Sequence, residues 1–283
     1  MSELIDAVIK TRKISAEIAV KSLIGINSIS EFKLHKLIIA KMSNCPDIFP
    51  EGWYAPPEGG VSVLFDKTPF KRLLYGSLRD PEYAPDTEHK FTIESVGNIY
   101  LSPVNKKTKT LADIGFTVYR GENEKIKQHL KKSYDIVRKI AEHAQIGMKF
   151  SELCKFASEL FINNNLKPTK RIIISSDQKQ NLNLGHSIPG SSENNLITEN
   201  SFQEIKEHIR TKRVSVVDTE DFIIPSTYAF TVESRLEDLN NPQMPSASWH
   251  FVVCFNEGEK TILDNFGEIF KTVGMNYMNT KQL

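Results

Sequence analysis

The segments that decide the fold are Ala112-Asp113-Ile114-Gly115, Gly185-His186-Ser187-Ile188-Pro189-Gly190, Phe230-Thr231-Val232-Glu233 and Ser246-Ala247-Ser248-Trp249-His250. Each segment places an Asp, a His or a Glu on or beside a stretch that we expect to be a strand. These three residue types bind hard and borderline divalent metals. The segments therefore indicate a metal centre built on a sheet.

The residues between these segments have the patterns of alternating helices and strands. Apolar residues recur at helical spacing over residues 3–22, 124–143 and 151–163, a further helix is expected at 201–210, and Ser28 with Glu31 gives a capping-box signal for another. Strands are expected at 61–65, 91–102, 110–119, 171–175, 214–217, 227–233, 248–255 and 260–263. We expect one α/β domain over residues 1–283, with an antiparallel sheet that helices cover on one face.

Composition and charge argue against several classes of protein. The 283 residues include 36 Lys and Arg against 35 Asp and Glu, a net charge of +1, so we expect neither nucleic acid nor an anionic membrane as the main partner. The sequence has no stretch of about 18 apolar residues, so we expect no membrane span. The start of the chain has no signal-peptide pattern, and the three cysteines form no paired motif. These features favour a cytoplasmic protein.

The order and spacing of the four segments resemble the methionine aminopeptidase, prolidase and creatinase family. The resemblance covers roughly residues 100–265, with a weaker similarity over 3–80. It implies a pita-bread fold, in which a curved antiparallel sheet carries helices on its outer face. It also implies two pseudo-symmetric halves, with the active site in the concave sheet between them and no extra N-terminal domain.

The resemblance also implies a set of metal ligands. Asp113 corresponds to the second of two carboxylates that bridge two metals in the family. The first carboxylate would fall on Ser102, and a hydroxyl brings no negative charge to offset a cation. His186, in a segment similar to Gly-His-Gly-Ile, and Glu233, in a segment similar to Phe-Thr-Ile-Glu-Pro, correspond to further ligands. The depleted carboxylates favour one metal (Fe, Mn or Zn) over two.

The last ligand depends on the alignment. Aligned on Ser246-Ala247 it falls on His250, and aligned on the turn at Gly258 it falls on Trp249. A slip of one residue reverses the face to which a strand residue points, so the two alternatives exclude each other. His250 lies between Trp249 and Phe251, and a satisfied core histidine is a plainer interpretation of it.

Two family histidines that face the substrate are replaced. Their positions correspond here to Tyr75 and Glu193. On this resemblance Glu193 or Glu233 is a candidate proton acceptor, Tyr75 a candidate hydrogen-bond donor to the substrate, and His186 a candidate acid or base. Glu193 and Tyr75 are equally interpreted as a solvated loop residue and a packing residue.

Three functions follow from these patterns. The first is a metal-dependent hydrolase or related lyase that acts on a small amide, an amino-acid derivative or a short peptide, with the metal activating a bound water. The second is a repurposed enzyme, either a non-haem iron oxidase or a metal-free enzyme that uses His186 as acid and base, as creatinase does. The third is a pseudoenzyme that binds other proteins. The sequence is also compatible with a homodimer.

Overall fold

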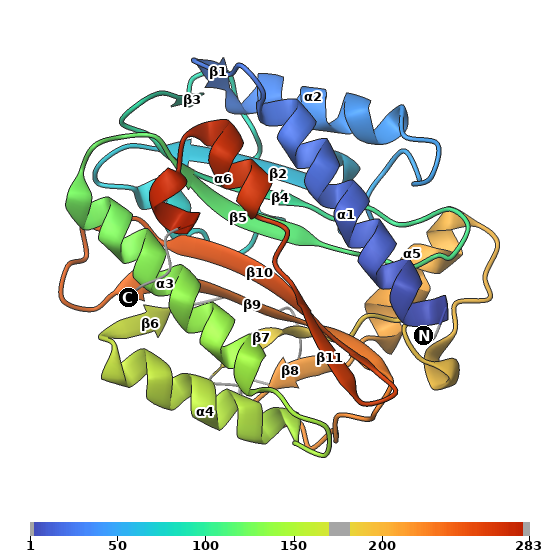
Figure 1. The fold of residues 1–283 in the computed structure, drawn as a ribbon. Helices are drawn as coiled ribbons and strands as arrows, with labels where there is room; N and C mark the ends of the chain where they lie inside the picture. Colours follow the sequence, from blue (N-terminus) through green and yellow to red (C-terminus); the bar gives the residue numbers. More distant parts are fainter. Residues whose placement is uncertain (1–2, 170–181, 280–283) are drawn as a thin grey trace.

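The computed structural model describes residues 3–169 and 182–279 (Figure 1). Its centre is a seven-stranded antiparallel sheet in the order β2-β4-β5-β10-β9-β6, with β11 paired to β10. The strands of this sheet are β2 (Val61–Asp66), β4 (Val96–Leu101), β5 (Ile114–Tyr119), β6 (Leu166–Pro168), β9 (Tyr228–Asp238), β10 (Ala247–Asn256) and β11 (Glu259–Leu263). Two short pairs lie outside it, β1 (Ile29–Ser30) with β3 (Lys90–Phe91) and β7 (Asn183–His186) with β8 (Ser215–Val217).

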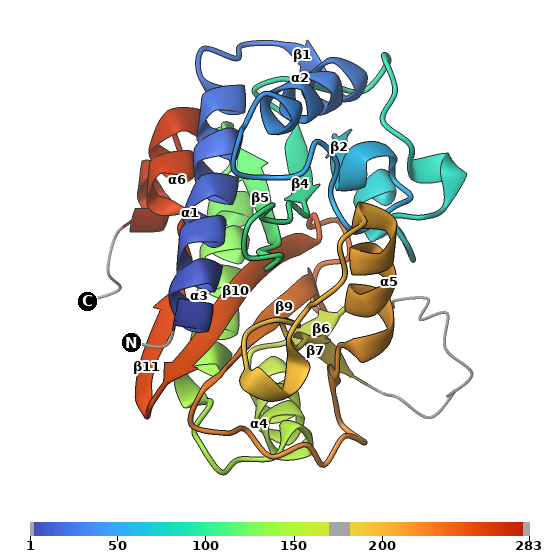
Figure 2. The ribbon, with the colours of Figure 1, turned by 90° about the vertical axis from the view of Figure 1, so that its right-hand side faces the viewer.

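The helices are distributed unequally over the two faces of the sheet. They are α1 (Glu3–Leu23), α2 (Glu31–Ser43), α3 (Glu124–His143), α4 (Phe150–Asn163), α5 (Phe202–Lys212) and α6 (Gly267–Val273). Figures 1 and 2 show α1, α3 and α6 together on one face, whereas α5 lies on the other side of the sheet. The expected arrangement, an antiparallel sheet with helices on its outer face, is confirmed.

The outer face of the sheet is apolar. Trp249 on β10 is fully buried, and its ring packs edge-on against Tyr134 of α3 and Phe270 of α6, with centroids 5.4 Å and 5.8 Å away. Phe116 of β5, opposite Trp249 in the register, contacts Phe266 just before α6. Because successive strand residues point to opposite faces, this packing places the neighbours of these residues on the inner face.

The inner face is polar along its central strands. The register sets Gly115 opposite Tyr100, Thr117 opposite Asn98, His250 opposite Glu233, and Ser248 opposite Arg235. Thr117 Oγ1 donates to Asn98 Oδ1 at 2.7 Å and accepts from the Ser248 amide at 2.7 Å. Hydrogen bonds of this kind satisfy buried polar groups and hold the two halves of the sheet together. Polar side chains with the capacity for chemistry are therefore concentrated on the side away from α1, α3 and α6.

Some expectations from the sequence are wrong in detail. Helix α2 begins at Glu31, and its cap is Ser30 rather than Ser28. Glu31 does not close a capping box, because its carboxylate binds Arg72 instead. The expected strand at 171–175 lies outside the described residues. Strand β7 and helix α6 had no clear signal in the sequence, since both are short.

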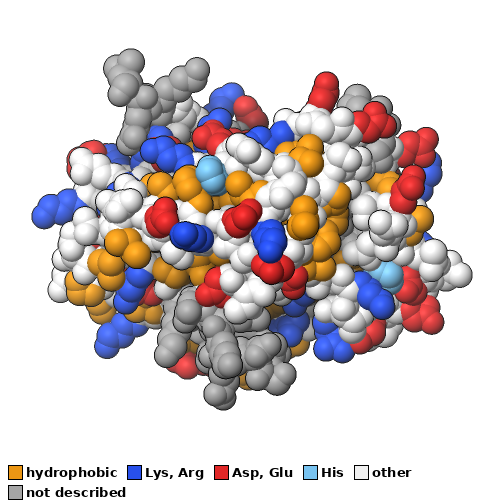
Figure 3. All heavy atoms as spheres, turned by 90° about the horizontal axis from the view of Figure 1, so that it is seen from below, with side chains coloured by type: hydrophobic (Ala, Val, Ile, Leu, Met, Phe, Trp, Pro, Cys, Tyr) orange, Lys and Arg blue, Asp and Glu red, His pale blue; other side chains and the backbone are white. Residues whose placement is uncertain are grey.

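No helix within residues 3–169 and 182–279 is long and apolar enough to cross a membrane. Acidic and basic side chains are interspersed across the face seen in Figure 3, with hydrophobic side chains between them. This mixture fits the near-neutral net charge of the chain.

Candidate functional site

Asp113 lies immediately before β5, with 2% of its surface exposed. Both of its carboxylate oxygens accept hydrogen bonds from neutral donors. The Trp53 indole Nε1–H donates to Oδ1 at 2.6 Å, and the Tyr100 hydroxyl donates to Oδ2 at 2.8 Å. These donors compensate a buried carboxylate for the water that it has lost.

His186, at the end of β7, lies beside this carboxylate. Its Nε2 is 3.5 Å from Asp113 Oδ2, and its Nδ1 is 2.8 Å from the Ser187 carbonyl oxygen, to which a proton on Nδ1 would be donated. The preceding residue, Gly185, has φ +132°, and a Cβ there would lie 2.2 Å from Thr231 Oγ1. Glycine therefore allows β7 to approach β9 closely enough to place the imidazole against Asp113.

His250 and Glu233 form a second pair of imidazole and carboxylate. They are directly opposite each other on β10 and β9, and His250 Nε2 lies 2.9 Å from Glu233 Oε2. Trp249 points into the outer core, so of the two alternatives from the sequence it is His250 that lies on the inner face. A Cβ at Gly115 would come within 2.8 Å of the His250 ring, so this glycine leaves the space that the imidazole occupies.

Tyr100 lies between the two pairs. Its hydroxyl bonds to Asp113, and its ring centroid is 5.5 Å from that of His250. Burial raises the pKa of Tyr100 well above its usual value, and the charges of Asp113 and Glu233 raise it further. The phenol is therefore a neutral hydrogen-bond donor at physiological pH.

Arg12 fixes the backbone of the site from the outer side. It is fully buried on α1 and donates to the carbonyl oxygens of Asp113, of His250 at 2.5 Å and of Asp264 at 3.1 Å. Burial lowers the pKa of this guanidinium to about 9, so it is still charged at neutral pH. One side chain thus ties together strands that carry a residue from each pair.

Other candidates from the sequence lie elsewhere. Ser102 is fully buried, and its Oγ donates to the Gly60 carbonyl oxygen at 2.9 Å, which is a packing role. The ring of Tyr75 stacks under the Arg235 guanidinium, 3.5 Å from centroid to Cζ. Glu193 is exposed on the 3₁₀ helix η4 (Glu193–Asn195). Within the described chain neither Tyr75 nor Glu193 hydrogen-bonds to the two imidazole–carboxylate pairs.

The sequence did not single out Trp53, Tyr100 or Arg12. Of these three residues, Arg12 alone had a signal in the sequence, because it is a cation within the apolar pattern of residues 3–22. Trp53 and Tyr100 had none, because their importance depends on contacts with Asp113, which lies 60 residues from Trp53 and 13 residues from Tyr100 along the chain.

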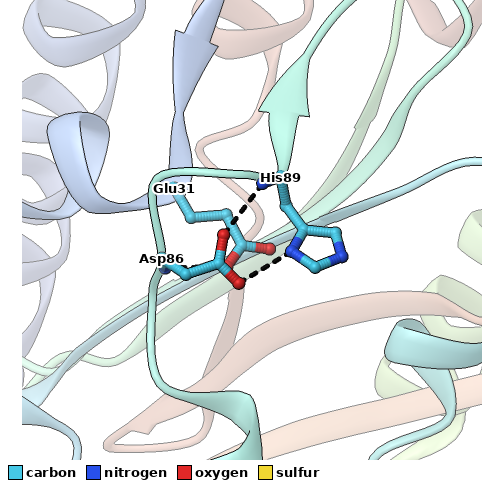
Figure 4. A group of neighbouring side chains, drawn as sticks. All are labelled: Glu31, Asp86 and His89. Atoms are coloured by element: carbon cyan, nitrogen blue, oxygen red, sulfur yellow. Dashed lines mark hydrogen bonds and ion pairs between the residues drawn. The ribbon is translucent and has the colours of Figure 1, made fainter.

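The donors of a metal centre have to converge on one point. In the described parts of the chain, one group of three His, Cys, Asp or Glu residues has ligand atoms that all lie within 4.8 Å of one another: Glu31, Asp86 and His89 (Figure 4). Arg72 already binds Glu31 there, with Nη2 2.8 Å from Oε2, and lies 3.5 Å from Asp86 Oδ2. The Arg72 guanidinium thus already supplies the positive charge beside these two carboxylates, where a metal ion would otherwise bind.

Asp113, His186, Glu233 and His250 form no such group, counting either ring nitrogen of each histidine. They stand as two separate pairs, with the Tyr100 hydroxyl against one and its ring near the other. In this arrangement the four side chains do not fit a preformed metal centre, and their assignment as ligands stays a prediction.

Comparisons with known proteins place the architecture. No protein-family model and no curated protein matches the sequence. The structure is similar to methionine aminopeptidase from Thermotoga maritima, with a TM-score of 0.63, 9% identity and coverage of 93% of this chain and 96% of that one. The fold is the pita-bread fold.

Longer enzymes contain the same fold. An X-Pro aminopeptidase from Thermotoga maritima has a TM-score of 0.60 at 13% identity, with 93% of this chain and 61% of that chain covered. Prolidase from Pyrococcus furiosus has a TM-score of 0.53 at 14% identity, with 100% of this chain and 65% of that chain covered. The present chain therefore spans less than two thirds of these two proteins. The resemblance inferred from the sequence is confirmed for the fold.

Proposed function

We propose that the polar inner face is the active site of a hydrolase or related lyase acting on a small amide, an amino-acid derivative or a short peptide. The observation that carries this proposal is the presence of two largely buried imidazole–carboxylate pairs, Asp113–His186 and Glu233–His250, on the inner face of a pita-bread sheet. Proteins of this fold include aminopeptidases and prolidases, which supports the reaction class.

The two pairs suit proton transfer. Imidazole is the side chain whose ordinary pKa lies closest to neutrality, and a carboxylate on one ring nitrogen holds the ring in place. His186 is held at Nδ1 by the Ser187 carbonyl and faces Asp113 with Nε2. His250 faces Glu233 with Nε2. In this proposal one imidazole–carboxylate pair, acting as a unit, accepts a proton from the nucleophile, and the other pair donates a proton to the leaving group.

Two arginines beside the site support a substrate that carries a carboxylate. The Arg213 guanidinium stacks on Trp53, with Cζ 4.8 Å from the ring centroid, and that of Arg79 stacks on Tyr54 at 4.5 Å. Within the described residues neither guanidinium pairs with a carboxylate, although arginine is well suited to bind one in a bidentate fashion. An amino-acid derivative or a short peptide with a free carboxylate would meet this requirement.

The metal-dependent form of the proposal uses the four side chains that the sequence assigned. Asp113, His186, Glu233 and His250 would hold the ion, which would polarise the substrate carbonyl and lower the pKa of a bound water. That form requires the ligand atoms of both pairs to move to within bonding distance of one ion. The chemistry of the two imidazoles does not depend on it.

The test is a screen of the full-length chain against dipeptides, N-acyl amino acids and simple amides, followed by His186→Ala and His250→Ala on any substrate that is turned over. We expect each variant to lower kcat/KM by about 100-fold or more, the usual contribution of a general acid or base. His208→Ala, on α5 and paired with Glu199, is the control that should keep full activity. Full activity in both site variants would contradict the proposal.

A further inference from the structure

We propose that this site works without a bound metal, because Tyr100 occupies the position between the two imidazole–carboxylate pairs where an ion would have to lie. The inference rests on the proposed function only in treating the inner face as the active site. It goes beyond it by assigning the central position to a side chain of the protein.

Asp113 is held by neutral hydrogen-bond donors. Trp53 donates to Oδ1 at 2.6 Å, and Tyr100 donates at 2.8 Å to Oδ2, the oxygen that also faces His186. Asp113 is almost completely buried, so water does not replace either donor without rearrangement of the surrounding rings. A metal ion would have to displace the hydroxyl and the aromatic ring that carries it.

The ligand atoms of the two pairs do not converge on one point. Metal–ligand bonds to nitrogen and oxygen are about 2.0–2.2 Å long for zinc, so ligand atoms around one ion lie within a few ångströms of each other. Within each pair the donors are close, at 3.5 Å for Asp113–His186 and 2.9 Å for Glu233–His250. No three donors drawn from the two pairs meet this condition in the described chain.

The carboxylates are already compensated by groups of the protein itself. Asp113 accepts hydrogen bonds from the neutral donors Trp53 and Tyr100, and Glu233 lies 2.9 Å from the His250 ring. Side chains of the protein therefore take the positions beside the carboxylates that an ion would need.

The experiment is an anaerobic titration of the chelator-treated, full-length protein with Co(II), Zn(II), Mn(II) and Fe(II), followed by visible absorption for Co(II) and by elemental mass spectrometry for all four. We compare the wild type with the His186→Ala/His250→Ala double variant and with His208→Ala as the control. We expect the same stoichiometry and the same Co(II) spectrum in all three. One equivalent bound by the wild type and by His208→Ala but lost in the double variant would overturn the proposal.

Two substitutions of Tyr100 test its part in excluding the ion. Tyr100→Ala removes the ring from between the pairs, and we expect it to gain Co(II) binding that disappears when His186→Ala is added. Tyr100→Phe keeps the ring and should gain none. A Tyr100→Ala variant that folds, as judged by near-ultraviolet circular dichroism, and still binds no Co(II) would refute the central role of this side chain. These measurements use no substrate, so they are independent of whether the screen finds a turnover.

Discussion

Glu233 and His250 are direct cross-strand partners, with His250 Nε2 2.9 Å from Glu233 Oε2. The adjacent strand β5 contributes Gly115, whose missing side chain provides the room for the imidazole. This triplet is an arrangement in which the pairing of the strands itself brings an imidazole against a carboxylate. The consequences of changing it are directly measurable.

Gly115→Ala should displace His250. The new methyl group would lie 2.8–2.9 Å from three atoms of the ring, which forces the ring away from Glu233. We expect kcat/KM to fall by about 100-fold, because small displacements of catalytic groups are costly, and stability to fall by about 1–3 kcal/mol. Enzyme assays and urea unfolding measure the two effects. Gly267→Ala, where a methyl group meets nothing within 4 Å, is the matched control. Unchanged activity in Gly115→Ala would show that the position of His250 is unimportant.

Arg12→Lys should destabilise the protein by about 3–5 kcal/mol, because one ammonium cannot reach the three carbonyl oxygens that the guanidinium bridges. Chemical unfolding followed by tryptophan fluorescence measures this loss. Lys13→Ala, one residue away and exposed, should change stability by no more than about 0.5 kcal/mol. Equal stabilities for the two variants would show that the bridge contributes little.

Tyr100→Phe should reduce the loss of stability in alkaline solution. The folded-state pKa of Tyr100 lies above its unfolded value, so its contribution is complete below about pH 10 and is lost as the pH rises from there toward the folded-state value. Urea unfolding from about pH 8 to about pH 11 should therefore show a shallower decline in the variant than in the wild type. Identical slopes would mean that the environment of Tyr100 does not disfavour the phenolate.

Arg72→Ala should be strongly destabilising, because it leaves the Glu31 carboxylate buried without its cation. The expected loss is about 3–5 kcal/mol near neutral pH. Burial already raises the pKa of Glu31, and without Arg72 the stability should fall as the pH rises above the ordinary range for glutamate. Adding Glu31→Gln should recover part of the loss, as measured by urea unfolding. No recovery would place the effect of Arg72 elsewhere, for example in its bonds to the Glu82 and Ala84 carbonyls.

Arg213→Ala should weaken the binding of a substrate that carries a carboxylate. We expect KM to rise by about 10-fold or more with kcat nearly unchanged, since the contact is made equally in the ground state and the transition state. Arg210→Ala, exposed and paired with Glu207 on α5, is a control of the same residue type nearby in sequence. Steady-state kinetics on a substrate and on its amide-capped analogue test the assignment. A KM that rises equally for both substrates would argue against recognition of a carboxylate.

The pattern of the sequence was enough to predict the sheet, the main helices, the strand that follows Asp113 and the strands that carry Glu233 and His250. Alternation of apolar and polar residues is a local property, so it can be read without the fold. The same alternation could not decide between Trp249 and His250. That choice depends on β10 pairing with β9 and β5, with Trp249 then packed against helices from other parts of the chain.

The sequence could not reveal the donors around Asp113 for a related reason. Trp53 is 60 residues away along the chain, and Tyr100 lies across a hairpin from Asp113. Nothing local distinguishes these aromatic residues from others in the core. The family resemblance predicts roles for Tyr75 and Glu193, whereas the side chain that contacts Asp113 is Tyr100.

The contacts of Arg12 imply an order of events during synthesis. Arg12 is synthesised well before its partners, because His250 follows 238 residues later and Asp264 follows 252 residues later. Until β10 has emerged, the guanidinium has only the Asp113 carbonyl to bind, and α1 has no completed sheet to pack on. Contacts that span so much of the chain slow folding and leave apolar surface exposed in the meantime. The backbone of the site is therefore fixed only once α1, β5 and β10 have come together.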